Sequence, residues 1–226
     1  MRGRKNCWEK ALRSGAKLKT VLVRDGWDSP LVKEAEEQGA SLYSAPDALF
    51  KLASEVETPQ NVIFSCEQPQ WTADALDGAG QVLLLDGLQD PGNLGTILRH
   101  RRKRSRLAPL CCARGCADPF SPKVRALDDG RGVPFCRALT LPLAEAAERL
   151  HKNGLPLYAT ALHEDSVPLS SVSLSKAAVI IGSEGKGVTE QALRLSDKRV
   201  IIPMKGRAES LNAGVAAAIV IYEMTK

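Results

Sequence analysis

The stretch "QVLLLDGLQDPGNLGTILR", residues 81–99, places a short apolar run directly before a glycine-containing loop and a helical segment. An unbroken apolar run is typical of a strand that is buried on both faces of a sheet. Further runs of this kind are LAPLCCA (107–113), LPLYATA (155–161), AAVIIG (177–182) and RVIIPM (199–204). Because helical or loop segments separate them, the pattern predicts an α/β fold on a parallel sheet, with helices on both faces.

A smaller unit precedes this sheet. Short apolar runs at 20–23, 40–44 and 61–64 alternate with helical stretches at 29–39 and 45–55. Ser29 before Pro30 is a helix start signal, and Gly39 marks the end of the same helix. We therefore expect a small α/β domain over residues 1–66, a polar linker without clear period over 67–80, and the larger domain over 81–226.

The charge of the chain is concentrated in one place. The formal net charge is +5, and "RHRRKRSR" at 99–106 holds six basic residues. A run of this kind is either a solvated helix face or a patch that binds phosphates, because clustered basic side chains release counterions from nucleic acid. The sequence leaves both interpretations open.

Cysteine and histidine usage gives little support to a metal site. The six cysteines form no Cys-x-x-Cys pair, and the three histidines have no ligand spacing to one another. We expect no metal, and we expect the thiols at 111, 112 and 116 to act as small buried hydrophobes.

The chain shows no sign of membrane insertion. It starts without an apolar signal region, and its longest apolar stretch, 213–222, is too short to cross a bilayer. We expect a cytoplasmic protein with no membrane contact.

Three loops are candidates for a ligand site, because ligands of parallel α/β sheets bind outside the carboxyl ends of the strands. They are "DGLQDPGNLGTILR" (86–99), "IGSEGKGV" (181–188) and "IPMKGRAESLNAGVAAAI" (202–219). The second loop does not have the glycine and hydroxyl positions of a phosphate-binding loop, and the chain has neither a Gly-x-Gly-x-x-Gly nor a Gly-x-Ser-x-Gly motif. Spacing therefore predicts a glycine-lined site without naming its ligand.

Polar residues crowd the start of the last apolar helix. A side-chain oxygen of Glu209 or Ser210 is expected to cap the helix. Asn212 is then expected inside the first turn, where asparagine is a mediocre helix former. Capping leaves Asn212 unexplained, and this favours a functional role for it.

Taken in order and spacing, the three loops resemble the three motifs of the SpoU (TrmH) family of RNA ribose methyltransferases. The resemblance implies a SPOUT-type α/β domain with a C-terminal trefoil knot, S-adenosylmethionine as methyl donor, and a homodimer. The acceptor it implies is the 2′-hydroxyl of a ribose in structured RNA, with rRNA favoured. A tRNA ribose methyltransferase and an RNA-binding homologue with impaired catalysis are the alternatives.

The first half of the chain resembles the small, ribosomal-protein-like substrate-binding domain that precedes the catalytic domain in many of these enzymes. Its usual opening helix and strand are not recognised, so we expect a domain that is truncated at its N-terminus. The sequence departs from the family at His100–Cys112 and at Leu127–Arg137. These departures are either frame errors in the source sequence or charge that faces RNA.

The resemblance also implies roles for individual residues. Residues matching the catalytic positions are Asn93, Arg99, Glu184, Ser210 and Asn212. Residues matching the positions that hold the methyl donor are Thr160, Ala161, Gly182, Glu184, Gly185, Ile202, Met204, Leu211 and Asn212.

Overall fold

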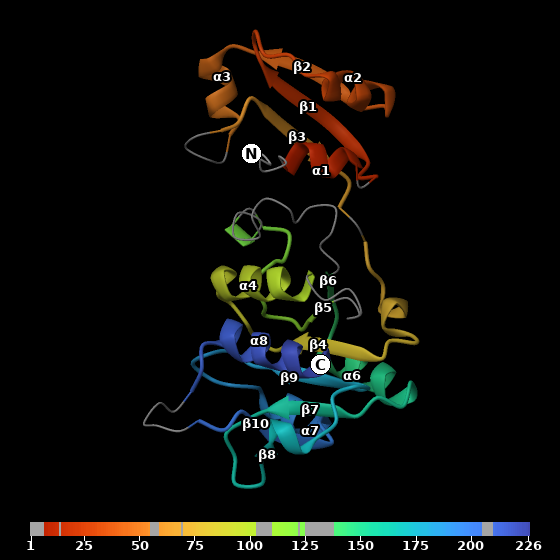
Figure 1. Cartoon of the computed structure of the whole chain (residues 1–226), viewed down its shortest axis with the longest axis vertical. Coiled ribbons are helices and arrows are strands. Elements are labelled where there is room, and N and C mark those ends of the chain that lie inside the picture. The colour runs from red at the N-terminus through yellow and green to blue at the C-terminus, as the bar shows by residue number, and fades with distance from the viewer. Residues whose placement is uncertain are drawn as a thin grey trace. The chain divides into compact units, whose positions relative to one another are not determined.

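The computed structural model describes residues 7–13, 15–54, 59–68, 70–102, 110–121, 123–124, 138–204 and 210–226 (Figure 1). These residues form two compact units. The first ends before Gln70 and the second begins there. The two units are described separately below.

The first unit is built on a three-stranded sheet of order β2-β1-β3. Strand β1 pairs in parallel with β2 and antiparallel with β3. The α/β character predicted for this region is confirmed, and α1 is a helix that the sequence patterns did not predict. The elements are α1 (Cys7–Arg13), β1 (Leu18–Arg24), α2 (Pro30–Glu37), β2 (Ser41–Ala45), α3 (Asp47–Leu52) and β3 (Val62–Cys66).

Local sequence explains where α2 begins. The Ser29 hydroxyl accepts a hydrogen bond from the Leu31 N–H at 3.4 Å, and Pro30 occupies the first helical position. Helices α1 and α2 share a core with the sheet, in which Trp8 and Val21 are buried. The predicted start signal at Ser29–Pro30 is therefore confirmed.

The second unit is built on a seven-stranded sheet of order β6-β5-β4-β9-β7-β10-β8, in which every neighbouring pair is parallel. The predicted parallel sheet is confirmed. Strands β6 and β8, of three and two residues, were not predicted. The strands are β4 (Gln81–Leu85), β5 (Leu110–Cys112), β6 (Ala138–Thr140), β7 (Leu157–Thr160), β8 (Val167–Pro168), β9 (Ala177–Ile181) and β10 (Lys198–Ile201).

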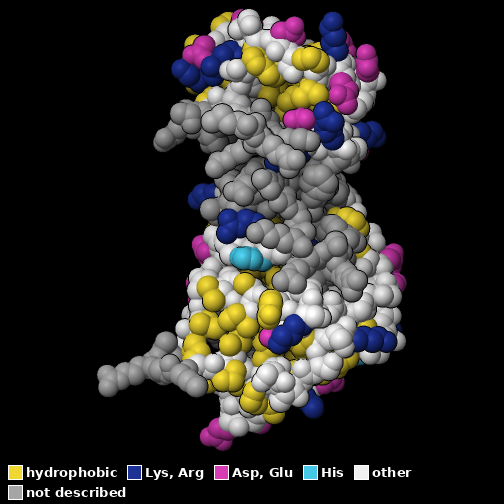
Figure 2. All heavy atoms as spheres, in the orientation of Figure 1, with side chains coloured by type: hydrophobic (Ala, Val, Ile, Leu, Met, Phe, Trp, Pro, Cys, Tyr) yellow, Lys and Arg dark blue, Asp and Glu magenta, His cyan; other side chains and the backbone are white. Residues whose placement is uncertain are grey.

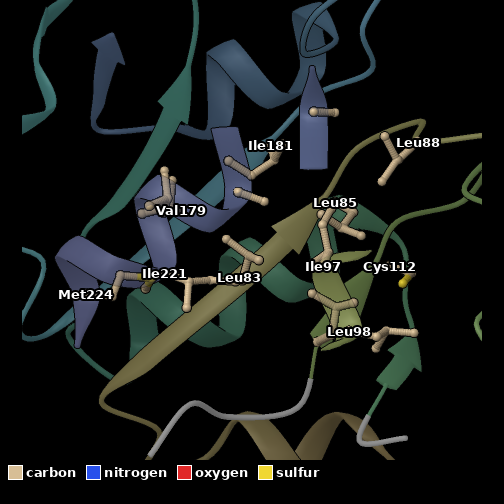
Figure 3. Close-up of a cluster of buried hydrophobic side chains, with 14 of the residues drawn as sticks. Leu83, Leu85, Leu88, Ile97, Leu98, Cys112, Val179, Ile181, Ile221 and Met224 are labelled. Carbon is tan, nitrogen blue, oxygen red and sulfur yellow. The ribbon is translucent and has the colours of Figure 1, made fainter. Parts of the chain in front are cut away.

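Helices cover both faces of this sheet. Alternate residues of β4 enter two different cores: Leu83 and Leu85 pack with residues of α4 and α8, whereas Leu84 packs with residues of α6 and α7. Figure 3 shows the first of these cores, where Ile97 of α4 and Ile221 of α8 lie near the β4 leucines. The helical elements are η1 (Ala73–Leu76), α4 (Pro91–Arg102), α6 (Leu143–Lys152), η2 (Leu169–Ser171), α7 (Glu190–Leu195) and α8 (Ala213–Met224).

The segment expected to be a linker contains an ordered element. Leu76 of η1 is fully buried in the core that α6 and α7 share. Arg149 of α6 forms ion pairs with Asp74 and with Asp77, the latter at 2.7 Å. Part of residues 67–80 therefore belongs to the second unit.

The basic run lies only partly within the described chain. Residues 99–102 are on α4, where Arg101 has 6% of its surface exposed and so does not belong to a solvated face. Residues 103–109 and 125–137, which include much of both departures from the family, lie outside the described residues.

The described ranges contain neither a membrane-spanning helix nor a cluster of metal-binding side chains. None of the helices there combines the length and the apolar character needed to span a bilayer. Nor do those ranges bring together three or more side chains of the metal-binding types. Cys111 and Cys112 are buried, as expected for thiols that act as hydrophobes.

Candidate functional site

Strand order brings the three predicted loops to one edge of the sheet. Strands β4, β9, β7 and β10 are consecutive neighbours and all parallel, so their carboxyl ends point the same way. Thr160 ends β7, Gly182 follows β9, and Ile202 follows β10. Helix α4, which carries Asn93, follows β4 after a short loop. Residues distant in sequence therefore meet at this edge.

The loop after β9, residues 182–188, is called the Glu184 loop here. Ser183 and Gly187 exchange two backbone hydrogen bonds of 2.9 Å, which close the loop on itself. A Cβ at Gly182 would stand 2.1 Å from the carbonyl carbon of Gly187, so only glycine fits there. Glu184 and Gly185 are exposed at the turn of the loop.

Asn212 is the N-cap of α8, and the expectation that it lies inside the first turn is wrong. Helix α8 begins at Ala213, and the Asn212 Oδ1 accepts the Val215 N–H at 3.1 Å. Ser210 lies two residues earlier and is exposed, while Glu209 is outside the described residues. Asn212 therefore caps α8, in place of Glu209 or Ser210, which the sequence had suggested for this role.

Asn212 also joins the other two loops. Its Nδ2 donates to the Asn93 Oδ1 at 2.8 Å and to the Glu184 Oε1. The same Glu184 oxygen accepts the Ala213 N–H at 3.3 Å. The side chain of Asn212 thus uses its oxygen and its amino group at once, which neither aspartate nor serine can reproduce. Three residues predicted to be catalytic form one hydrogen-bonded cluster.

Asn93 is held in place by its own loop and by α8. It is 6% exposed, and its backbone N–H donates to the Asp90 Oδ2 at 2.7 Å. Gly214 allows the close approach of α8, because a Cβ there would stand 3.3 Å from the Asn93 Oδ1. Within the described residues the Asn93 Nδ2 makes no hydrogen bond, which leaves it as a donor for a ligand.

Arg99 and Ser210 are not members of the hydrogen-bonded cluster. Arg99 is half-buried on α4, six residues and about 9 Å beyond Asn93 along the helix axis. It is more than two turns from the start of α4 at Pro91. Arg99 lies on α4 and Ser210 lies just before α8, so both residues belong to the elements that carry the cluster.

The positions expected to hold the methyl donor line the same edge. The Thr160 hydroxyl donates to the Ile180 carbonyl at 2.9 Å, and the Ala161 N–H donates to the Val200 carbonyl at 3.1 Å. Ile202 and Leu211 are half-buried, and Met204 is 37% exposed.

Leu162 is a further residue of this edge that sequence reasoning missed, with 74% of its surface exposed. A leucine in a loop carries no periodic signal, so only its place in the fold identifies it. The chemistry of this edge fits an adenosyl group with a charged sulfonium: apolar side chains suit the adenine ring, backbone groups can hydrogen-bond to it, and an exposed carboxylate suits the positive sulfonium.

A parallel sheet with a glycine loop and a polar cluster at its carboxyl edge defines an α/β protein with a ligand site. The model of the SpoU rRNA Methylase family matches residues 80–222, and that of RNA 2′-O ribose methyltransferase substrate binding matches residues 5–72. The chain belongs to the SpoU family of RNA methyltransferases, which uses S-adenosylmethionine.

Relatives and solved structures agree with this assignment. The 23S rRNA (guanosine(2553)-2′-O)-methyltransferase RlmP of Bacillus subtilis is 34% identical over 96% of this chain and 84% of its own length. The AdoMet-bound rRNA methyltransferase from Sinorhizobium meliloti has a TM-score of 0.84 at 25% identity, over 96% of this chain and 83% of that one. The SpoU methyltransferase AviRb from Streptomyces viridochromogenes, at 24% identity, shares the fold with a TM-score of 0.81 over 97% of this chain and 85% of its own.

Proposed function

We propose that this chain transfers a methyl group from S-adenosylmethionine to the 2′-hydroxyl of a ribose in rRNA. The observation that carries the proposal is the hydrogen-bonded cluster of Asn93, Glu184 and Asn212 at the carboxyl edge of the parallel sheet. The RlmP relative, which is named as a 23S rRNA 2′-O-methyltransferase, supports rRNA as the substrate class.

When bound, the donor would supply a methyl group on a sulfonium. The bond from the methyl carbon to sulfur would break as the bond to the ribose 2′-oxygen forms, which leaves a neutral thioether, and the hydroxyl proton would pass to solvent water. A ribose hydroxyl is a weak nucleophile at neutral pH, so positioning and stabilisation of the developing charge on oxygen are needed. In our proposal Arg99 helps to activate the hydroxyl, and the Asn93 Nδ2 orients it. Asn212 fixes Asn93 through the 2.8 Å hydrogen bond, and Glu184 fixes Asn212.

The apolar side chains of the edge are assigned to the donor. Leu162 and Met204 are exposed, and Ile202 and Leu211 are half-buried, so they offer apolar surface to an adenine ring. Backbone groups of Gly182 and Gly185 complete the site in this proposal.

The first unit is proposed to bind the RNA substrate. It coincides with the match to the substrate-binding model over residues 5–72. The shape of structured RNA, read by this unit and by loops, then selects the target nucleotide. A cytoplasmic location and a trefoil knot in the C-terminal segment stay predictions. The first is supported by the bacterial RNA methyltransferase relatives, the second by the shared SPOUT-type fold.

We also propose a homodimer that forms through α8. This helix is apolar on its outer side as well: Val215 is 47% and Tyr222 51% exposed, and Figure 2 shows hydrophobic side chains gathered over α8. A groove of about 300 Å³ runs between α4 and α8, lined in part by Ala218 and Ile219. A contiguous apolar surface of this kind is typical of an interaction site.

Light scattering tests the dimer. Tyr222→Asp places a charge on the proposed interface, so we expect the mass in solution to fall to that of a monomer. Leu52→Asp is the matched control, because Leu52 is 82% exposed on α3, which belongs to the first unit and not to the proposed interface. A wild-type protein that is monomeric at micromolar concentration would show that the interface is assigned wrongly.

Methyl transfer from labelled S-adenosylmethionine tests the function itself. The purified protein is incubated separately with total rRNA and total tRNA, and the modified ribose is mapped by mass spectrometry of nuclease fragments. We expect label in one ribose of rRNA. Label in tRNA alone would favour the tRNA alternative. RNA binding without transfer would favour the homologue with impaired catalysis.

A further inference from the structure

Asp86 is a buried carboxylate for which the proposed reaction has no use. It directly follows β4, at the same edge of the sheet as the cluster, and is 5% exposed. A carboxylate buried in this way costs free energy unless its oxygens accept hydrogen bonds. Its contacts therefore indicate what it stabilises.

Two hydrogen bonds of Asp86 lie at the ends of the Glu184 loop. The Asp86 backbone N–H donates to the carbonyl of Ile181 at 2.9 Å, immediately before the loop. The Asp86 Oδ2 accepts the Thr189 N–H at 2.6 Å, immediately after the loop. One residue directly after a central strand thus contacts both ends of the loop.

The position of the rest of the loop depends on how its two ends, at Ile181 and Thr189, are held. Leu85 pairs with Ile181 in the β4–β9 register, so the entry to the loop is fixed by the sheet. Thr189 also caps α7, accepting the Ala192 N–H at 3.2 Å, so Asp86 and α7 both hold the exit, beyond the Ser183–Gly187 pair that closes the loop. Between the ends, Glu184 reaches out to Asn212. A displaced exit would move Glu184 away from Asn212.

We propose that Asp86 is a positioning residue for the methyl-donor site, which sets the place of Glu184 and Gly185 by closing the ends of the Glu184 loop. The inference rests on the proposed function for its link to the donor. The part that concerns the loop alone can be tested in the ligand-free protein.

Asp197 provides a matched control. Its Oδ2 accepts the Leu157 N–H at 2.7 Å, which is the same kind of carboxylate-to-backbone bond. Asp197 precedes β10 and Leu157 begins β7, so this bond lies at the amino ends of the parallel strands, away from the Glu184 loop. Asp197→Ala therefore removes a bond of the same kind, together with the 3.2 Å contact of this exposed carboxylate with His151, without touching the site.

Hydrogen exchange and calorimetry test the proposal together. In Asp86→Ala we expect the amides of 182–189 to exchange about tenfold faster or more, and the Kd for S-adenosylmethionine to rise by about the same factor. Asp197→Ala should change neither quantity. Asp86→Asn keeps an oxygen that accepts the Thr189 N–H, so its Kd should stay within about threefold of the wild-type value.

Two results would overturn the proposal. One is wild-type exchange of the loop in Asp86→Ala; the other is an equal loss of donor affinity in Asp197→Ala. If Asp86→Ala does not fold, Asp86→Ser, whose side chain is too short to reach Thr189, takes its place with the same expectations. A wild-type protein that binds no donor would refute the proposed function, while the exchange rates would still decide whether Asp86 holds the loop.

Discussion

Replacing Gly182 by alanine tests whether the closed form of the Glu184 loop builds the donor site. The added Cβ would stand 2.1 Å from the carbonyl carbon of Gly187, 2.3 Å from its oxygen and 2.3 Å from the Val188 nitrogen. All three are backbone atoms, so no side chain can rotate away. Since non-bonded carbon atoms prefer about 3.5–4.0 Å, the two strands of the loop must separate by more than about 1 Å.

This separation sets the size of the effect. It breaks the two 2.9 Å hydrogen bonds between Ser183 and Gly187, which together contribute about 1–3 kcal/mol. Replacing a glycine also lowers the conformational entropy of the unfolded chain, which stabilises the folded protein by about 0.4–1 kcal/mol. The difference is a destabilisation of up to about 2.6 kcal/mol, which we expect to be concentrated at the site that the loop forms.

Calorimetric titration with S-adenosylmethionine is the assay, and thermal unfolding of the same samples shows that the fold is kept. We expect the Kd of Gly182→Ala to rise at least about tenfold, equivalent to about 1.4 kcal/mol. Gly80→Ala is the control, because a Cβ there meets nothing within 4 Å and lies at the other end of β4. Donor affinity unchanged in a folded Gly182→Ala protein would refute the reasoning.

Three further predictions concern single side chains. Asn212→Asp keeps the cap on Val215 but places a second carboxylate beside Glu184 and removes the donor to the buried Asn93 oxygen, so we expect a destabilisation of about 1–3 kcal/mol, and in the folded protein methyl transfer reduced at least about 100-fold; methyl transfer at the wild-type rate would contradict this. Arg99→Ala should lower kcat by about 100-fold or more while calorimetry finds donor affinity unchanged, and a loss confined to RNA affinity would show that Arg99 only contacts phosphate. Burial raises the pKa of the Cys111 thiol to about 12, so about one thiol in ten thousand is ionised at pH 8; iodoacetamide should modify Cys111 only after unfolding, as peptide mapping can check.

The sequence by itself determined the elements whose signal is local. Apolar runs predicted β4, β7, β9 and β10, because strands buried on both faces need such runs. Ser29 and Pro30 predicted the start of α2, since a cap depends on neighbouring residues alone. The order and spacing of three motifs gave the family.

Only the tertiary structure decided how these parts meet. Asn212 bonds to Asn93 across 119 positions and to Glu184 across 28. Both bonds exist because α8 packs against α4 and β9, in a domain whose strand order differs from chain order. The role of Asp86 has the same origin, since Thr189 is 103 positions away from it. Hydrophobic periodicity reports burial along one segment, whereas a hydrogen bond between loops depends on the relative place of two segments. For this reason the residues of the site were predicted from motifs, and their contacts were found only in the fold.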